Sequence, residues 1–250
     1  MLPLERQNRI LEILAVRKAA SVEELCRELY SSGATIRRDL AYLESSGLLC
    51  RTHGGAVRME ESGRDFPLLL RESENTVSKD IIARKALELI EDGQTIFMDA
   101  SSTVCRLAEK LSGFQRLRVI TNGLKTAGIL AEKDGVEVYC TGGRLRGNAK
   151  SFVGLPAVSF VERFHADTAF FSCRGVSEEA GVTDASEEEA DLKRTYLRHA
   201  RRGVLLADCS KLSLQYFCRI CALDEIDTLV SDIPLSPPYV LPSAPETATK

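Results

Sequence analysis

The stretch "ATIRRDLAYLESSGLLCRTHGGAV", residues 34–57, decides the architecture expected for the first part of this chain. Three apolar residues recur at i, i+4 and i+7, so they share one face of a helix and pack inward: Ile36, Leu40 and Leu43. At about 100° per residue, the opposite face carries two cations and two small residues: Ala34, Arg37, Arg38 and Ala41. The pattern predicts an amphipathic helix whose exposed face is positively charged and shallow.

Two more helices are expected upstream. In "LERQNRILEILAVRK" the apolar residues recur at helical spacing: Leu4, Ile10, Leu11, Ile13 and Leu14. "SVEEL" is typical of a capping box, in which the Ser21 and Glu24 side chains satisfy free backbone N–H groups. The helix that it opens has a predicted core face: Val22, Leu25 and Leu29. Ser32 is the expected N-cap of the third helix, because its hydroxyl can accept from a first-turn N–H.

A short hairpin is expected after the third helix. "LLCRTHGGAVR" contains two apolar-rich runs around Gly54 and Gly55, which give a tight turn its backbone freedom. Arg51, His53 and Arg58 lie on or beside this hairpin, where they can contact a sugar-phosphate backbone. Three helices followed by such a hairpin indicate a winged helix-turn-helix.

This domain predicts DNA binding. An arginine can grip guanine or phosphate through two hydrogen bonds, and a good base contact gives about 1–3 kcal/mol of discrimination. A helix of this size fits the major groove. An isolated arginine pair is more often a solvated surface, but here the inward stripe and the hairpin favour DNA. The predicted DNA-binding residues are Ser32, Thr35, Arg37, Arg38, Arg51, His53 and Gly54.

Composition narrows the remaining classes. The 250 residues are 44% hydrophobic and 28% charged, with a net charge of −3 that divides into +2 for residues 1–58 and −5 for the rest. No apolar run is long enough to span a bilayer, and the N-terminus lacks the pattern of a signal peptide. The eight cysteines are scattered, as expected of reduced thiols in a cytoplasmic protein. Cys218 and Cys221 form one C-x-x-C without a second pair, so core packing is favoured over metal or redox chemistry.

The rest of the chain alternates helix and strand, which predicts an α/β domain with a mainly parallel sheet. We expect a winged helix-turn-helix domain at 1–58, a linker at 59–78, an α/β domain at 79–233 and a Pro-rich, disordered tail at 234–250. No G-x-G-x-x-G follows the first strand, so no dinucleotide is expected, and we predict neither a cofactor nor a metal.

Polar residues follow four of the predicted strands, in "FMDASST", "ITNGL", "CTGGRLRG" and "LADCSK". Hydroxyls and free N–H groups at a helix start favour an anion, and ligands of open α/β sheets bind at the carboxyl ends of the strands. Each motif by itself is more often an N-cap or a turn, but together they favour a small polar ligand. The predicted effector-binding residues are Asp99, Ser101, Ser102, Thr103, Thr121, Asn122, Gly142, Gly143, Asp208 and Lys211.

The run T-I-R-R-D-L, followed by G-L-L and R-x-H-G-G-A, resembles the signature of the DeoR family of bacterial transcriptional regulators. The chain departs from the family pattern at Ser31, where an apolar residue is usual, and at Gly33, where a larger residue is usual. "VITN", "TGGRLR", "SFVG" and "LADCSKL" resemble the DeoR-type sensor domain, which has a ribose-5-phosphate isomerase-like fold. The resemblance implies a repressor of sugar metabolism that binds operator DNA, senses a phosphorylated sugar and forms a homo-oligomer. Lys193 matches a family lysine that either contacts ligand or sheet edge or is solvated.

Two alternatives come from other classes. The fold is also that of sugar-phosphate isomerases, but the strand "DTAFFSC" leads into "RGVSEEAG", where no acid stands at the expected place of a catalytic base, and Glu187 to Glu189 look like a solvated helix start. We therefore predict that the protein is not an enzyme. The large domain could instead only oligomerise; saturable binding of a sugar phosphate would separate that alternative from a sensor.

Overall fold

The computed structural model describes residues 2–17, 19–46, 48–52, 54–57 and 68–239. Contacts divide the chain into two units, Met1–Glu74 and Asn75–Lys250, and each is described by itself. Of the segment expected to be a linker, 59–78, residues 59–67 lie outside the described residues, as does Arg58 before it. The rest was wrongly predicted, because two helices begin there, Leu68–Ser73 and Thr76–Leu87. No helix in the described part of the chain is long and apolar enough to cross a membrane.

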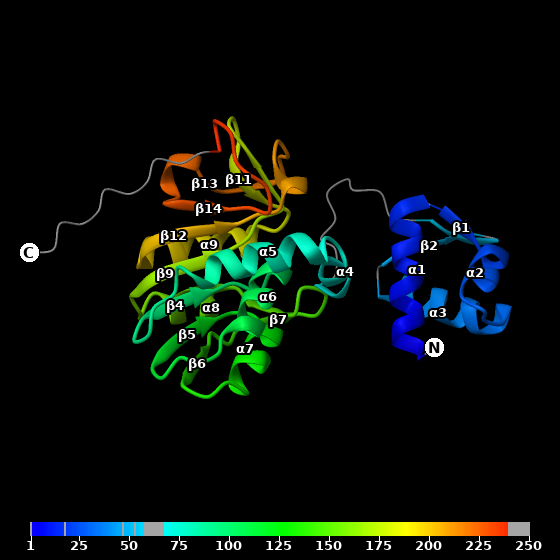
Figure 1. Cartoon of the computed structure of the whole chain (residues 1–250), viewed down its shortest axis with the longest axis horizontal. Helices are drawn as coiled ribbons and strands as arrows, with labels where there is room; N and C mark the ends of the chain where they lie inside the picture. Colours follow the sequence, from blue (N-terminus) through cyan, green and yellow to red (C-terminus); the bar gives the residue numbers. More distant parts are fainter. Residues whose placement is uncertain (1, 18, 47, 53, 58–67, 240–250) are drawn as a thin grey trace, which may run out of the picture. The chain divides into compact units, whose positions relative to one another are not determined.

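The first unit is a small helical domain with a short sheet (Figure 1). Its elements are α1 (Pro3–Arg17), β1 (Ala19–Ser21), α2 (Val22–Glu28), α3 (Gly33–Ser45), β2 (Cys50–Thr52), β3 (Gly55–Val57) and α4 (Leu68–Ser73). The predicted three helices and hairpin are confirmed. The inward residues of α3 are fully buried in one cluster with side chains of α1 and α2: Ile36, Leu40 and Leu43. The prediction for Leu4 is wrong, because this residue lies in the first turn of α1 and is 57% exposed.

The sheet of this unit contains one strand more than the sequence predicted. Within the described residues its order is β1-β3-β2, and both neighbours of β3 run antiparallel to it. Gly55 of β3 faces β1 so closely that a Cβ there would lie 2.1 Å from the carbonyl oxygen of Ala20. The close approach of β1, rather than the turn alone, therefore requires a glycine at this position.

The second unit is built on a six-stranded sheet of order β14-β12-β9-β4-β5-β6, in which all neighbours are parallel. The predicted α/β domain with a mainly parallel sheet is confirmed. Its helices are α5 (Thr76–Leu87), α6 (Ser102–Lys110), α7 (Leu124–Ala131), α8 (Leu155–Val161) and α9 (Glu187–His199), with the 3-10 turns η1 (Cys209–Lys211) and η2 (Leu223–Glu225). The six strands are β4 (Thr95–Met98), β5 (Leu117–Thr121), β6 (Val136–Cys140), β9 (Ala166–Phe171), β12 (Ala200–Leu206) and β14 (Thr228–Val230).

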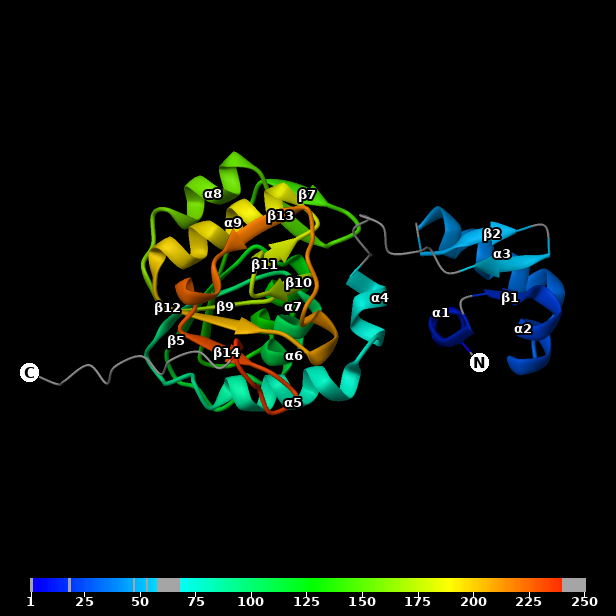
Figure 2. The ribbon, with the colours of Figure 1, turned by 90° about the horizontal axis from the view of Figure 1, so that it is seen from above.

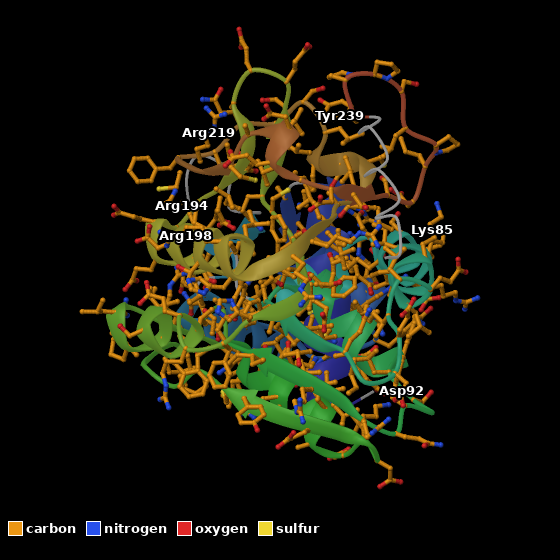
Figure 3. The ribbon with its side chains drawn as sticks, turned by 90° about the vertical axis from the view of Figure 1, so that its left-hand side faces the viewer. Lys85, Asp92, Arg194, Arg198, Arg219 and Tyr239 are labelled. Atoms are coloured by element: carbon orange, nitrogen blue, oxygen red, sulfur yellow. The ribbon has the colours of Figure 1, made fainter. Side chains whose placement is uncertain are left out.

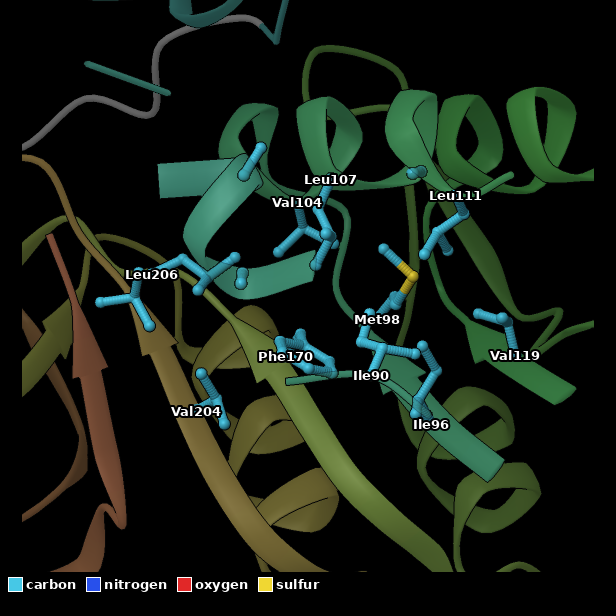
Figure 4. Packing of buried hydrophobic residues seen from close by; sticks show 14 of the residues in the cluster. Ile90, Ile96, Met98, Val104, Leu107, Leu111, Val119, Phe170, Val204 and Leu206 are labelled. Carbon is cyan, nitrogen blue, oxygen red and sulfur yellow. The ribbon is translucent and has the colours of Figure 1, made fainter. Parts of the chain in front are cut away.

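Helices cover both faces of this sheet (Figure 2). Side chains alternate along each strand, so Ile96 and Met98 of β4 pack with α5, α6 and α7, while Phe97 between them packs with α8 and α9. Figure 4 shows the first of these clusters, in which Val104 and Leu107 of α6 lie over Met98 and Phe170. Because both faces of the sheet are buried, each strand carries apolar residues on both sides and appears in the sequence as a short continuous apolar run.

Two smaller sheets complete the unit, and the sequence did not predict them. Strands β7 (Arg144–Arg146) and β8 (Ser151–Val153) form a hairpin, and β10 (Gly175–Ser177), β11 (Gly181–Asp184) and β13 (Cys218–Cys221) form an antiparallel sheet. Arg194 of α9 donates to the carbonyl oxygen of Arg219 in β13 and so ties this sheet to the helix (Figure 3). Cys218 and Cys221 are free thiols on β13, and Cys221 is buried in its apolar cluster, as the core-packing interpretation predicted.

The predicted tail, residues 234–250, is described only as far as Tyr239. Its hydroxyl accepts a hydrogen bond of 3.0 Å from the N–H of Ser213, so residues up to this point still contact the domain.

Candidate functional site

The first candidate site is the exposed face of α3. Ser32 caps the helix as predicted, because its Oγ accepts from the N–H of Thr35 at 3.2 Å. The two hydroxyls of Ser32 and Thr35 are also hydrogen-bonded to each other at 2.9 Å. Both side chains therefore fix where the helix begins, in the way that N-cap residues do.

Arg37 and Arg38 stand on the exposed face of α3, one turn beyond this cap, and within the described residues neither forms an ion pair. Gly33 leaves room beside them: a Cβ there would lie 3.1 Å from Nη1 of Arg37. The guanidinium of Arg37 thus lies against the first turn of the helix. Two cations without carboxylate partners give this face the charge that a polyanion needs.

A buried ion pair holds α3 against α1. Asp39 of α3 is only 3% exposed, and its carboxylate accepts from Arg6 Nε at 2.5 Å and from Gln7 Nε2 at 3.1 Å. This contact was not predicted from the sequence. The signal was available, because Asp39 stands three residues after Ile36 and one before Leu40, on the face that packs inward.

The structure describes two of the three predicted wing residues, Arg51 and Gly54. Arg51 is exposed, but its N–H donates to Oε1 of Glu44 at 3.0 Å, and its guanidinium lies 3.8 Å from Oε2 of the same residue. Gly54 is exposed, with open space where a Cβ would be. His53 lies outside the described residues.

The second candidate site is the carboxyl edge, by which we mean the residues that follow the carboxyl ends of the six parallel strands. The predicted effector residues follow β4, β5, β6 and β12, so all of them lie on this one edge. With strands about 4.8 Å apart, the ends of β12 and β4 are about 10 Å apart and those of β12 and β6 about 19 Å apart. A small ligand can span the first distance but not the second.

Asp99 lies at the centre of this edge, directly after β4. Its Oδ1 accepts from the N–H of Ser101 at 2.9 Å, and its Oδ2 accepts from the N–H of Ser172, after β9, at 3.0 Å. The side chain is 1% exposed. Asp99 therefore joins two neighbouring strand ends.

Lys193 of α9 lies in the same place, and it is buried rather than solvated. Its Nζ is 2.6 Å from Oδ2 of Asp184, at the end of β11, and 3.4 Å from Oδ2 of Asp99. Burial alone would lower the pKa of Lys193, but the two carboxylates outweigh it, and the pKa is raised. The ammonium group thus stays charged in the interior. Asp184 was missed because it ends β11, one of the short strands that the sequence did not predict.

Two more buried groups of α9 face the carboxyl edge. The hydroxyl of Tyr196 donates to Oδ1 of Asn122 at 3.1 Å, and the amide of Asn122 donates to the carbonyl oxygen of Phe152 at 3.2 Å. Glu189 accepts from the hydroxyl of Ser151 and from Arg146 Nη1. Burial raises the pKa of the Glu189 carboxyl despite Lys193 nearby. The prediction of a solvated helix start is wrong for Glu189, because this residue is buried and hydrogen-bonded to Ser151 and Arg146, which are distant in sequence.

The first turn of α6 offers free donors beside Asp99. Ser101 is the N-cap, and its Oγ accepts from the N–H of Val104 at 3.3 Å. Within the described part of the chain, the N–H groups of Ser102 and Thr103 have no acceptor, as is normal for a first turn. Thr121, at the end of β5, is fully buried and its Oγ1 accepts from the N–H of Gly123 at 3.0 Å. The anion-binding capacity of this part therefore lies in α6.

Part of the loop after β6 packs against α8. Gly142 and Gly143 both have positive φ, of 65° and 106°. A Cβ at Gly143 would lie 2.8 Å from the carbonyl oxygen of Val153 and 3.3 Å from Cβ of Ala157 in α8. The glycine thus permits the loop to pack on α8, which is the structural alternative considered for this motif.

The loop after β12 carries the remaining predicted residues. Oδ1 of Asp208 accepts from the N–H and the hydroxyl of Ser210 and from Nδ2 of Asn75. Burial raises the pKa of the Cys173 thiol, after β9, to about 12, and four charges act on it: Lys193, Lys211, Asp184 and Asp208. Cys173 follows β9, the strand that lies between β12 and β4 in the sheet. Lys211 is half-buried, and no carboxylate within the described residues pairs with it.

The chain matches two family descriptions that together cover most of its length. "DeoR-like helix-turn-helix domain" matches residues 6–62, and "DeoR C terminal sensor domain" matches residues 74–233. The chain belongs to the DeoR family. It is accordingly a DNA-binding transcriptional regulator.

Relatives in this family match over nearly their whole length. The chain is 38% identical to the HTH-type transcriptional regulator GolR of Listeria innocua and 40% identical to GlpR of Haloferax volcanii, in each case over 93% of this chain and 91% of the relative. It is 30% identical to the glycerol-3-phosphate regulon repressor of Escherichia coli, over 92% of this chain and 91% of that protein. Among solved structures, ribose 5-phosphate isomerase A of Methanocaldococcus jannaschii is similar at 16% identity and a TM-score of 0.40, over 54% of this chain and 53% of that one, which carries no conclusion about activity.

A cavity of about 720 Å³ in this DeoR-family protein lies at the opposite ends of the strands. Its lining residues come from the turn before β4, from the starts of β5 and β6 and from the turns before these two strands: Gly93, Gln115, Arg116, Leu117, Arg118, Gly135, Val136 and Glu137. Asp92, labelled in Figure 3, marks this end of the sheet, and its Oδ1 accepts from the N–H groups of Gln115 and Arg116. The carboxyl edge, with its buried charges, remains the better candidate for a ligand.

Proposed function

We propose that this regulator represses genes of carbohydrate metabolism and that a small phosphorylated compound, bound at the carboxyl edge of the second unit, changes its affinity for operator DNA. The single observation that carries the DNA half is the face of α3. Arg37 and Arg38 are exposed there without carboxylate partners, while the opposite face is fully buried. Repression is supported by the name of the Escherichia coli relative, the glycerol-3-phosphate regulon repressor.

In this proposal α3 enters the major groove. Arg37 and Arg38 contact base edges or phosphates, and Ser32 and Thr35 set the start of the helix. Arg51, His53 and Gly54 place the wing on the sugar-phosphate backbone. A symmetric homo-oligomer would present two such helices to successive turns of the duplex.

For the effector we propose a narrower site than the ten predicted residues. The phosphate would accept from the N–H groups of Ser102 and Thr103 at the start of α6 and pair with Lys211, because these donors are not used within the described part of the chain. Asp99, Asn122 and Asp208 already make hydrogen bonds inside the protein, so they would shape the site. Gly142 and Gly143 would not take part, since both follow β6, whose end is about 19 Å from that of β12, and Gly143 packs against Val153 and Ala157.

An isomerase is the second candidate, and two observations disfavour it. The relatives above are named as transcriptional regulators. Glu189, the buried acid of α9, has one oxygen that already accepts from both Ser151 and Arg146. We infer that Glu189 holds the β7–β8 hairpin against α9 rather than removing a proton from a substrate.

Fluorescence anisotropy with DNA from upstream of the protein's own gene tests the proposal. At fixed salt, we expect glycerol 3-phosphate or another compound from a panel of sugar phosphates to change the DNA affinity by about 5–150-fold, the range typical of coupled sites. Arg38→Ala should weaken DNA binding about 10-fold or more, because it removes a guanidinium worth about 1–3 kcal/mol. Lys211→Ala should keep DNA binding and lose the response.

This experiment tests the DNA-binding part and the effector part of the proposal separately. Unchanged DNA affinity in both Arg37→Ala and Arg38→Ala would contradict the assignment of α3. Tight DNA binding that no phosphorylated compound alters would contradict the effector half, and direct calorimetric titration would then show whether the compound binds without effect. Lys125→Ala, on the exposed side of α7, serves as the charge-matched control for Lys211→Ala.

A further inference from the structure

Asn75, the first residue of the second unit, has an unusual arrangement. It stands at the N-cap of α5 with φ 50° and ψ 39°, yet its side chain makes no capping hydrogen bond. Its amide nitrogen instead donates to Oδ1 of Asp208 and to Oγ of Ser210, both at 3.2 Å. Asparagine is an effective N-cap. Here the amide is used to hold the loop after β12, 133 residues away in the sequence.

A second carboxylate ties the same two segments together. Oδ1 of Asp232, after β14, accepts from the N–H of Cys209 at 2.9 Å. Burial would raise the pKa of Asp232, but hydrogen bonds from the Ser78 hydroxyl and from Cys209 outweigh it, and the pKa is lowered. The first turn of α5 and the loop 208–211 are therefore joined twice, through Asp208 and through Asp232.

We propose that Asn75 is a positioning residue that couples the loop 208–211 to the point where the chain passes from the first unit to the second. This loop follows β12, next to β9 in the sheet, and carries Lys211. The inference rests on the proposed function for the identity of the ligand, but not for the coupling itself.

The hydrogen bonds indicate how the coupling works. The hydroxyl of Ser210 donates to Asp208 and accepts from Asn75, so it lies between the two side chains. An anion that pairs with Lys211 and accepts from the Ser210 hydroxyl takes the hydrogen that this hydroxyl donates to Asp208. The two acceptors of the Asn75 amide are then no longer joined to each other, and their hold on Asn75 is weakened. Left-handed backbone is unfavourable for residues other than glycine unless contacts hold it. Once released, Asn75 can take right-handed helical angles, lengthen α5 and turn the chain that arrives from Glu74.

A double-mutant cycle on DNA affinity tests the coupling without any ligand. Asp208→Asn weakens the acceptor in the loop, and Asn75→Gly keeps the left-handed backbone while removing the amide. We expect Asp208→Asn alone to change the affinity for the upstream DNA about 5-fold or more, within the range typical of coupling. In the Asn75→Gly background the same change should have an effect of less than about 2-fold. Thr76→Ala, exposed on the next residue, is the matched control and should leave the effect of Asp208→Asn intact.

Each other outcome overturns the inference. If Asp208→Asn has an equal effect with and without Asn75→Gly, the amide does not transmit it; if it has no effect in either background, the loop is not linked to DNA binding. Hydrogen exchange gives a second readout: Asn75→Gly should speed exchange in both 76–79 and 209–212, and protection unchanged in the loop contradicts the link. The proposed function fails separately, when glycerol 3-phosphate and the other sugar phosphates leave wild-type DNA affinity unchanged although the cycle remains non-additive.

Discussion

Individual residues at the carboxyl edge place ionisable groups in the interior, and each group is held by partners from other elements. Lys193 is held between Asp184 and Asp99, and Glu189 between Ser151 and Arg146. Removing one partner of a buried pair is costly, because the other charge is left without compensation. These contacts join α9 to β4, β11 and the β7–β8 hairpin, so they fix the walls of the proposed effector site.

Glu189 makes a pH-dependent contribution to the free energy of unfolding, and the sign of this contribution follows from the raised pKa of its carboxyl. The folded state holds its proton more tightly than the unfolded chain, where the pKa is near 4.5. The contribution of this group to stability is thus full below that value and falls as the pH rises through the folded pKa. Glu189→Gln keeps an acceptor oxygen and cannot ionise, so its free energy of unfolding relative to wild type should increase with pH.

Urea unfolding at about pH 5 and about pH 8 measures this difference for Glu189→Gln and wild type. Glu188→Gln, at the more exposed neighbouring position, is the control and should change the free energy of unfolding at neutral pH by no more than about 0.5 kcal/mol. A stability difference for Glu189→Gln that shrinks as the pH rises would show that the carboxyl is held as a charge.

The sequence could predict residues whose role depends on near neighbours and not those whose partners are distant. Ser32 caps α3 with the N–H three residues on, and its role was predicted from the local pattern. Lys193 and Glu189 contact side chains whose positions depend on the packed sheet. The sequence therefore left the role of Lys193 undecided and wrongly predicted a solvated Glu189. The side-chain bond between Asn75 and Asp208, which joins two loops, could not be read from either segment alone.

At the level of elements, side chains of α1 help to fix the orientation of α3. The pair Arg6–Asp39 is largely buried, with side-chain exposures of 12% and 5%, and Gln7 adds a hydrogen bond from the same turn of α1. An amphipathic helix with a fully apolar buried face could rotate or slide more freely on its neighbours. A directional contact between α1 and α3 therefore supports a fixed orientation for Arg37 and Arg38.

Asp39→Ala should destabilise the first unit by about 2–4 kcal/mol, because it leaves the Arg6 guanidinium largely buried without its carboxylate. Glu12→Ala breaks the exposed pair Arg9–Glu12 on the same helix and should cost less than about 1 kcal/mol. Thermal unfolding followed by circular dichroism compares the two. Equal losses in both variants would mean that the Arg6–Asp39 pair is screened by solvent and does not orient α3.

The elements that the sequence predicted carry a clear apolar pattern, and those it missed do not. Helices α1, α3 and α5 show a helical period, and the six parallel strands read as apolar runs, although β14 has only three residues. Strands β1, β7, β8 and β10 have three residues each and show neither pattern. They form because neighbouring segments bring a free strand edge to them, as β3 does for β1, which is information that the local sequence does not contain.

At the scale of the whole molecule, the buried side chains form separate cores. The cluster around Ile36, Leu40 and Leu43 contains only residues of the first unit, and the clusters on either side of the parallel sheet contain only residues of the second. A switch of the proposed kind needs this separation, because each unit must keep its own fold while the connection between them changes.

Matched truncations test this separation. Leu40 and Leu206 are both fully buried, one in each unit, and Leu→Ala at such sites costs about 2–5 kcal/mol. Distant sites without shared partners act independently. In hydrogen exchange followed by mass spectrometry, Leu40→Ala should therefore speed exchange within residues 3–57 and leave 75–239 protected, and Leu206→Ala should do the reverse. Leu40→Ala should also abolish DNA binding at a temperature where the second unit still binds a phosphorylated compound. If either change instead speeds exchange in both units equally, the chain unfolds as one cooperative body, and a signal between the sites cannot run through the junction at Asn75 alone.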